Sequence, residues 1–283
     1  MFKSLLLGIA FLFATTITLF AQQKNSFFRP KTQIGIATGI INYQGDLVDN
    51  TFDFTQTKLT YSAFLRREFS SLLSFRIGVD YGTLSGSDKS STTIPRQQRN
   101  LSFNTKIFGG YFGTELTFAN FYVGNIIPVK IYGYLGIGVF NFKPRAKYND
   151  EWIELKPLST EGQGLNPYVT SKPYNLTQLY YPMAFGIKMP ISNKLDLGFE
   201  LKKVLTSTDY IDDVSGNYAA PEILSNSSNP ELTKALANRT QELSADFKPS
   251  FGRRGNPNNF DGWFTTQLTL TYKFGKKGCT NYF

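Results

Sequence analysis

The side chains that could do chemistry in this 283-residue chain are carboxylates and cations, because it contains no histidine and only one cysteine. Without histidine, Ser-His-Asp catalysis, Cys-His catalysis and histidine-based metal sites are excluded. The densest acidic stretch contains Asp209, Asp212 and Asp213, whose oxygens could bind Ca²⁺. Their spacing does not match an EF-hand loop, so we favour pairing of these carboxylates with Arg253 or Arg254. The sequence therefore predicts no metal and no cofactor.

Two enzymatic chemistries can be considered for the same region. Ser215, followed by Gly216, could serve as a nucleophile, but carboxylates are the only bases near it in the sequence. Paired carboxylates also carry out glycoside hydrolysis, but no aromatic-lined cleft is recognisable around them. We therefore expect a protein that is not an enzyme.

A second set of charged residues lies within segments that alternate between apolar and polar types. Successive residues of a strand face opposite sides of the sheet, so each segment has one apolar face and one polar face. Over 195–202, for example, leucine and phenylalanine alternate with aspartate, glycine, glutamate and lysine. The charged residues that share the inward, polar face of these segments are Arg66, Arg76, Asp80, Glu115, Lys188, Glu200 and Lys202.

These segments predict an all-β fold, an eight-stranded antiparallel transmembrane barrel of the outer-membrane type. Short turns alternate with long loops centred near Asp46, Asp88, Trp152 and Asp213, as in bacterial barrels. The content of 26 Phe and 16 Tyr suits the aromatic girdles of such a barrel. The predicted strands are 33–43, 56–68, 73–84, 102–118, 130–143, 178–189, 194–205 and 263–274.

The inward charges decide what the lumen of this barrel can do. Eight strands enclose an interior that side chains roughly fill. Because an unpaired buried charge is costly, we expect the inward charges to pair in a network that plugs the lumen. The alternative is an ion path lined by Glu115, Glu200 and Arg76.

The N-terminus predicts a secretory signal peptide at residues 1–21, with a basic residue ahead of an apolar stretch. A transmembrane anchor is the alternative, since the stretch is nearly long enough to span a bilayer. We expect 22–283 to form one barrel domain, with strands over about 33–274 and a periplasmic C-terminal tail at 275–283. This topology puts both termini in the periplasm and the long loops outside the cell.

The last long loop is expected to contain a short amphipathic helix. Asn229 can cap it and Pro230 can occupy its first turn. Leu232, Ala235 and Leu236 then fall on one side, which could pack over the mouth of the barrel.

Three short motifs lie at the ends of predicted strands: one closes the first strand, one follows the seventh, and one precedes the last. Together they resemble the PorG-like family of outer-membrane barrels, which belong to the type IX secretion system of gliding and periodontal bacteria. The block after the seventh strand is the most specific of the three. The residues that carry the resemblance are Tyr43, Gly45 and Asp46; Asp209, Tyr210, Asp212, Asp213 and Gly216; and Arg254 and Gly255.

The resemblance implies a non-enzymatic component that anchors a periplasmic ring, made of a PorK-like lipoprotein and a PorN-like subunit, to the outer membrane. The expected partners are these ring proteins and outer-membrane lipids, and we do not expect nucleic acid to bind despite the net charge of +9. A small outer-membrane transport or ligand-binding barrel is the alternative function. Residues of the tail that could contact the ring are Lys276, Lys277, Cys279, Tyr282 and Phe283.

Cys279 is the single cysteine of the chain, so it cannot form an internal disulfide. In the oxidising cell envelope it could form an intermolecular disulfide with a partner. The alternative is a frayed tail with an unused thiol.

Overall fold

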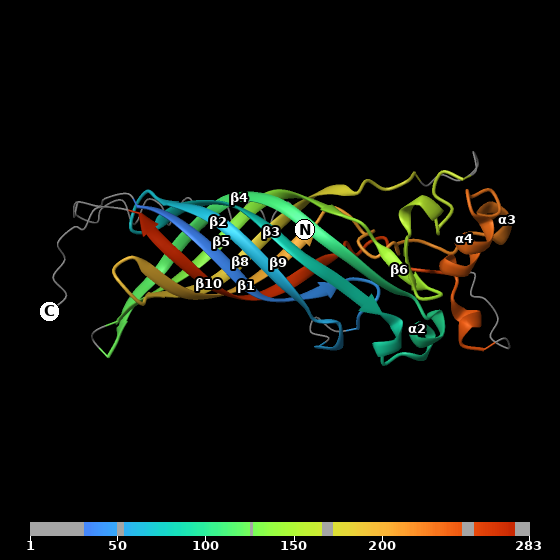
Figure 1. Ribbon diagram of the computed structural model, residues 1–283, viewed down its shortest axis with the longest axis horizontal. Helices are drawn as coiled ribbons and strands as arrows, with labels where there is room; N and C mark the ends of the chain where they lie inside the picture. The colour runs from blue at the N-terminus through green and yellow to red at the C-terminus, as the bar shows by residue number, and fades with distance from the viewer. Residues whose placement is uncertain (1–30, 50–53, 125–126, 166–171, 245–251, 275–283) are drawn as a thin grey trace. The chain divides into compact units, whose positions relative to one another are not determined.

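The computed structural model describes residues 31–49, 54–124, 127–165, 172–244 and 252–274. Within them, eight long strands form a closed antiparallel barrel, which confirms the predicted fold (Figure 1). In chain order these strands are β1 (Thr32–Gln44), β2 (Lys58–Glu68), β3 (Leu73–Ser87), β4 (Ser102–Val123), β5 (Ile127–Phe142), β8 (Thr177–Pro190), β9 (Leu195–Thr206) and β10 (Gly262–Phe274).

Two strand pairings, β1 with β10 and β3 with β4, close the barrel. β1 pairs with β10 over its whole length, from Thr32 opposite Phe274 to Gln44 opposite Gly262. β3 pairs with β4, so the sheet that runs from β3 through β1 and β9 to β4 returns on itself. A closed barrel removes the free sheet edges that a bilayer does not tolerate.

The inner faces of the strands carry small and polar residues between large ones. On β1, Gln33 and Ala37 face inward and are buried, whereas Ile36 faces outward and is exposed. Small residues are needed because the lumen of eight strands is narrow. At Gly186 on β8, an added Cβ would lie 2.4 Å from the ring of Tyr132, the residue paired with it on the adjacent strand β5.

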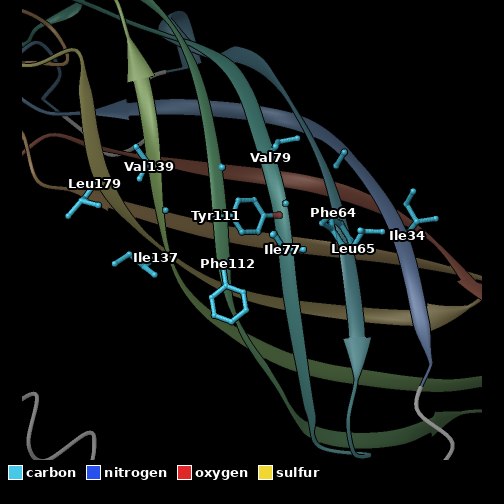
Figure 2. A pocket seen from close by; sticks show the side chains of 14 residues that line it. Ile34, Phe64, Leu65, Ile77, Val79, Tyr111, Phe112, Ile137, Val139 and Leu179 are labelled. Carbon is cyan, nitrogen blue, oxygen red and sulfur yellow. The ribbon is translucent and has the colours of Figure 1, made fainter.

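The outer face of the barrel is an extended apolar surface. Figure 2 shows part of it, where Ile77, Phe112 and Ile137 project from neighbouring strands. Soluble monomers rarely expose so large a contiguous apolar patch, whereas a transmembrane barrel presents such a band to lipid. In the middle of this region the outward residues Ala63 and Gly110 are small, which leaves a shallow hollow in the band.

The two ends of the barrel differ in their connections. The turns between β2 and β3 and between β8 and β9 are short, and β1 begins and β10 ends at this same end. The opposite end carries the long connections and the helices of the described residues (Figure 1). Those helices are α2 (Ile94–Arg99), α3 (Pro221–Leu224) and α4 (Pro230–Ala237), with short 3-10 turns at Phe54–Gln56, Asp88–Ser90, Lys156–Leu158 and Thr240–Glu242.

The helix expected in the last loop is present as α4. The side chain of Asn229 accepts a hydrogen bond from the Leu232 amide at 3.4 Å, which is the predicted cap. The buried Leu236 packs in a cluster with Leu155 and Leu158 of an earlier loop. No helix in the described ranges is long and apolar enough to cross a membrane.

Two features of the connections differ from the sequence prediction. The segment 119–129 is predicted to be a turn, but β4 continues through a bulge between Thr117 and Ala119 as far as Val123. β5 already starts at Ile127. This stretch has no charged residue to end the strands. The loop after β5 contains a further hairpin, β6 (Arg145–Tyr148) and β7 (Glu151–Glu154), which the sequence analysis did not predict.

Candidate functional site

The inward charges of the walls lie together in the half of the barrel nearest the short turns. Glu115 on β4 faces Arg66 on β2 and Arg76 on β3, with oxygen–nitrogen distances of 2.9 and 2.8 Å. Lys188 on β8 approaches the other carboxylate oxygen of Glu115 at 2.6 Å. Arg76 also pairs with Glu200 on β9 at 2.7 Å. All five side chains are almost completely buried.

The remaining inward charges extend this lumen network. Lys202 on β9 pairs with Asp80 on β3 at 2.8 Å. Arg66 donates a hydrogen bond of 3.0 Å to Gln33, which donates in turn to Glu68 at 2.8 Å. With Glu68 included, the charges of the network cancel: the cations are Arg66, Arg76, Lys188 and Lys202, and the anions are Glu68, Asp80, Glu115 and Glu200.

Aromatic rings complete the environment of the two arginines. The Nε atoms of Arg66 and Arg76 make no hydrogen bond within the described residues. Their guanidinium carbons instead lie 5.1 and 4.6 Å from the centre of the Phe64 ring, where cation–π attraction is favourable. The hydroxyl of Tyr132 donates to Glu200 at 2.8 Å. A lumen filled by paired charges and rings is the plug expected for a barrel of this size.

An aromatic layer lies between the lumen network and the long loops. The Phe140 ring is 5.2 Å from Trp263 and 5.7 Å from Tyr180, measured between centres, and both contacts are edge-on. Tyr43 and Phe103 make a similar contact at 4.7 Å. Edge-to-face pairs of this kind stabilise a packed interior beyond the burial of their area. The layer therefore separates the charges of the lumen from those at the mouth.

The three motifs meet at the mouth, although they lie far apart in the sequence. The Tyr43 hydroxyl oxygen, at the end of β1, is 2.7 Å from an Asp212 oxygen and 2.6 Å from an Asp261 oxygen. The carboxylate of Asp46 accepts a hydrogen bond of 2.6 Å from the Asn256 amide. All four of these acidic and phenolic side chains are buried. We call Tyr43, Asp46, Asp209, Asp212 and Asp261 the mouth cluster.

Two glycines of the motifs are required by the packing of the mouth cluster. A Cβ at Gly45 would lie 1.9 Å from the Tyr43 hydroxyl oxygen and 2.0 Å from Asp261. A Cβ at Gly255 would lie 2.4 Å from the carboxylate of Asp46. Real atoms do not approach so closely, so any other residue would push the acidic groups apart.

A second buried group surrounds Arg254. Its guanidinium lies 3.1 Å from Glu161 and donates to the Asp213 carbonyl. Its other terminal nitrogen is 3.9 Å from the Asp213 carboxylate, so one expected carboxylate–arginine pair is present. Glu161 also accepts from the Gly216 amide at 3.2 Å. Tyr210 stacks on a neighbouring tyrosine ring, Tyr174, with centres 4.6 Å apart.

The other carboxylates of the acidic block do not reach an arginine. Asp212 bonds to Tyr43 instead, and Asp209 makes no ion pair within the described ranges. Arg253 donates to the backbone and side chain of 255–256, at 2.9 and 2.6 Å. The expectation of arginine pairing is therefore wrong for Asp209 and Asp212: Asp212 contacts Tyr43 at the end of β1, and Asp209 is buried away from the arginines.

Burial dominates the acid–base properties of this region. It raises the pKa of Asp212 well above its usual range, and the charge of Asp46 adds to the effect. The pKa of Asp261 is raised in the same way, by burial first and then by Asp212. Burial raises the pKa of Asp209 to about 8 and that of Asp213 to about 6. These carboxylates therefore hold protons far more strongly than exposed ones.

The Ca²⁺ site considered for the acidic block finds no support. In the part of the chain that the structure describes, no three acidic or cysteine side chains are placed to hold a metal ion. Ser215, the weak nucleophile candidate, is buried, and its amide donates to Glu161 at 2.9 Å.

Some residues of the mouth could not be found by sequence analysis. Arg99, the last residue of α2, pairs with the buried Asp88 at 2.6 Å and donates to the carbonyl of Asp46 at 2.8 Å. Glu161 lies in a loop with no alternating pattern and no motif. Nothing local in the sequence indicates that Glu161 meets Arg254. The predicted tail residues Lys276, Lys277, Cys279, Tyr282 and Phe283 and the predicted signal peptide lie outside the described residues.

Solved structures similar to this chain are small barrels. Ail of Yersinia pestis, crystallised with the heparin analogue sucrose octasulfate, is 7% identical with a TM-score of 0.38, and the match covers 87% of this chain and 100% of Ail. Neisserial surface protein A gives the same four values. The N-terminal β-barrel domain of Pseudomonas aeruginosa OprF is 7% identical with a TM-score of 0.33, covering 87% of this chain and 100% of that domain. Values this low carry no information on function.

A family comparison covers most of the chain. None of the curated proteins matches it. The model of a protein family described as a domain of unknown function, DUF6089, matches residues 11–226. This range contains the first seven strands of the barrel wall, from β1 to β9, and two of the three motifs. The chain belongs to the DUF6089 family.

Proposed function

We propose that this protein is a non-enzymatic outer-membrane component of the type IX secretion system, which anchors a periplasmic ring of PorK-like and PorN-like proteins to the membrane. The observation that carries the proposal is the convergence of the three motifs. Tyr43 of the first motif lies 2.7 Å from Asp212 of the second, and Arg254 of the third donates to the carbonyl of Asp213. The motifs that resemble the PorG-like family are thus parts of one buried structure, as a shared architecture requires.

The arrangement of the barrel ends supports the proposed orientation. β1 starts at Thr32 and β10 ends at Phe274, and both points lie at the end with the short turns. Bacterial barrels keep short turns in the periplasm and long loops outside. In this orientation the tail after Phe274 is on the periplasmic side, where it could contact a ring.

The neutral lumen network favours an anchor over a transport barrel. Conduction needs a path with water or mobile ions, and the side chains of Arg66, Arg76 and Glu115 occupy the lumen as fixed ion pairs. Planar-bilayer recording separates the two functions. We expect no discrete conductance steps from the purified protein, and regular steps would favour the transport barrel.

The test of the anchor is recovery of the ring from outer membranes. A tagged full-length protein should retain the ring lipoprotein after gentle solubilisation, and a deletion strain should lose secretion. Removal of 276–283 should preserve membrane insertion and weaken ring recovery, whereas Cys279→Ser distinguishes loss of a disulfide from loss of the whole tail. Recovery of the barrel alone, together with normal secretion in the deletion strain, would contradict the proposal.

A further inference from the structure

The hydroxyl group of Tyr43 has more close neighbours than one proton can serve. Oxygens of Asp212 and Asp261 lie 2.7 and 2.6 Å from it, and the Asp46 amide donates to it at 3.2 Å. A tyrosine hydroxyl donates one hydrogen bond. If both carboxylates were ionised, one of them would face a lone pair of Tyr43 at hydrogen-bond distance with no proton between the two oxygens.

The other oxygens of the same two carboxylates are already committed as acceptors. Asp261 accepts from the Ile211 amide at 2.8 Å, and Asp212 accepts from the Val214 amide at 2.9 Å. The orientation of each carboxylate is therefore fixed by the backbone of 211–214. Neither can turn away from Tyr43 to relieve the repulsion without losing a buried hydrogen bond.

We propose that Asp212 and Asp261 share one bound proton across the Tyr43 hydroxyl, and that this proton holds the loops over the mouth of the barrel. One acid donates to Tyr43, and Tyr43 donates to the other. The proton links the end of β1 to the segment 209–218 and to the residue before β10. Its loss places two repelling carboxylates against one hydroxyl and releases the loops.

The cations near the cluster, among the residues that the structure describes, do not pair with Asp212 or Asp261. Within the described residues no lysine or arginine nitrogen lies within ion-pair distance of Asp212 or Asp261. The nearby arginines are engaged elsewhere, Arg99 with Asp88 and Arg254 with Glu161. The titratable and charged groups that face the cluster from the packed segments are Asp46, Asp88, Arg96, Arg99, Glu161, Tyr174, Asp209, Tyr210, Asp213, Tyr218, Arg253 and Arg254.

Asp209 is a further buried acid of the mouth cluster. It is 5% exposed, and neither of its carboxylate oxygens accepts a hydrogen bond within the described residues. Burial raises its pKa to about 8, although the nearby Ser215 opposes the shift. Asp209 also contributes to the raised pKa of both Asp212 and Asp261. The whole cluster therefore prefers to be protonated.

The direction of the pH dependence follows from these raised values. An aspartate whose pKa is higher in the folded loops than in the unfolded chain binds its proton more tightly when folded. Stability is then greatest in acid and decreases as the pH rises from about 4, the ordinary value of aspartate, through the raised value. The loops should open in alkali.

Hydrogen exchange on the full-length protein in lipid vesicles tests the proposal. After correction for intrinsic exchange, peptides from 208–218 and 254–261 should lose protection between pH 6 and pH 9. Asp261→Asn should keep the protection seen at pH 6, since its amide can donate to Tyr43 while its oxygen accepts from Ile211. In the wild type, the shared proton should make protection fall about tenfold for each pH unit. This contribution should be absent from Asp261→Asn, which needs no shared proton.

The matched comparison is between one and two substitutions. Asp212→Asn alone should behave as Asp261→Asn does, because either amide can take the place of the protonated acid. The double variant should be less protected than either single one at pH 6, since the Tyr43 hydroxyl then lacks an acceptor. Infrared spectra at pH 6 should show one more protonated carboxylic acid in the wild type than in either single variant. Equal protection of the wild-type loops at pH 6 and pH 9, or no such additional acid signal, would overturn the proposal.

Discussion

At the scale of single residues, Glu115 is the centre of the lumen network. It is completely buried and faces three cations, Arg66, Arg76 and Lys188. Each of these cations is far from water, so the carboxylate is what makes their burial tolerable. The structure therefore depends on this one side chain more than on any exposed ion pair.

Glu115→Gln should lower the free energy of unfolding by about 3–5 kcal/mol, because it leaves buried cations without their anion. Urea titration in lipid vesicles, followed by fluorescence, measures this loss. Asp196→Asn is the control: Asp196 forms a single, more accessible pair with Lys273. Its removal should cost about 1 kcal/mol or less. Equal effects of the two substitutions would show that the lumen charges do not act as a network.

The glycines of the mouth give a second residue-scale prediction. Gly255→Ala should loosen the loops, because its Cβ would lie 2.4 Å from Asp46 and 2.7 Å from the Ser215 carbonyl oxygen. Gly252→Ala has open space around the new Cβ and should be neutral. Limited trypsin digestion at the nearby Arg253 compares the two variants. Faster cleavage is expected in Gly255→Ala alone, and identical rates would contradict the described packing.

Residue parity could be predicted from the sequence, but loop partners could not. Alternation along each strand placed Arg76 and Glu200 on the inner face, and the barrel then brought them within 2.7 Å. Asp212 shows the limit. Its partner Tyr43 lies far away in the sequence, near the N-terminus. Only closure of the barrel, in which β10 lies between β1 and β9, brings the end of β1 close to the segment after β9. No local pattern carries that information.

At the scale of elements, the long loops fold as a packed layer. α4 begins at the Asn229 cap, and its buried Leu236 contacts Leu155 and Leu158 from the loop after β5. The cap and the proline were readable in the sequence. The β6–β7 hairpin was not, because each of its strands has only four residues, two of them charged.

Leu236→Ala should release α4 from this layer. Truncating a buried leucine costs about 2–5 kcal/mol, which corresponds to at least about a thirtyfold rise in local opening. Protease cleavage within 221–243 under native conditions measures that opening. Lys234→Ala, on the partly exposed side of α4, is the matched control and should change cleavage little. Faster cleavage in Lys234→Ala but not in Leu236→Ala would contradict the packing of α4 through Leu236.

At the scale of the whole molecule, closure of the sheet explains both the surface and the interior. Closure turns the alternating pattern into an outer apolar band and an inner polar column. The pattern of alternation was sufficient to predict this architecture, because the strands obey the same parity rule over most of their length. The plugged lumen follows from the small strand number.

The account rests on lipid contact along the outer face, and spin-label scanning of β2 tests that contact directly. In a Cys279→Ser background, a label is placed at each position from Leu59 to Leu65 in lipid vesicles. We predict strict alternation: high oxygen accessibility at Leu59, Tyr61, Ala63 and Leu65, which face outward, and low accessibility to oxygen and to water-soluble relaxants at Thr60, Ser62 and Phe64. Uniform access of the water-soluble relaxant, or a helical period, would contradict a lipid-embedded barrel with a filled lumen.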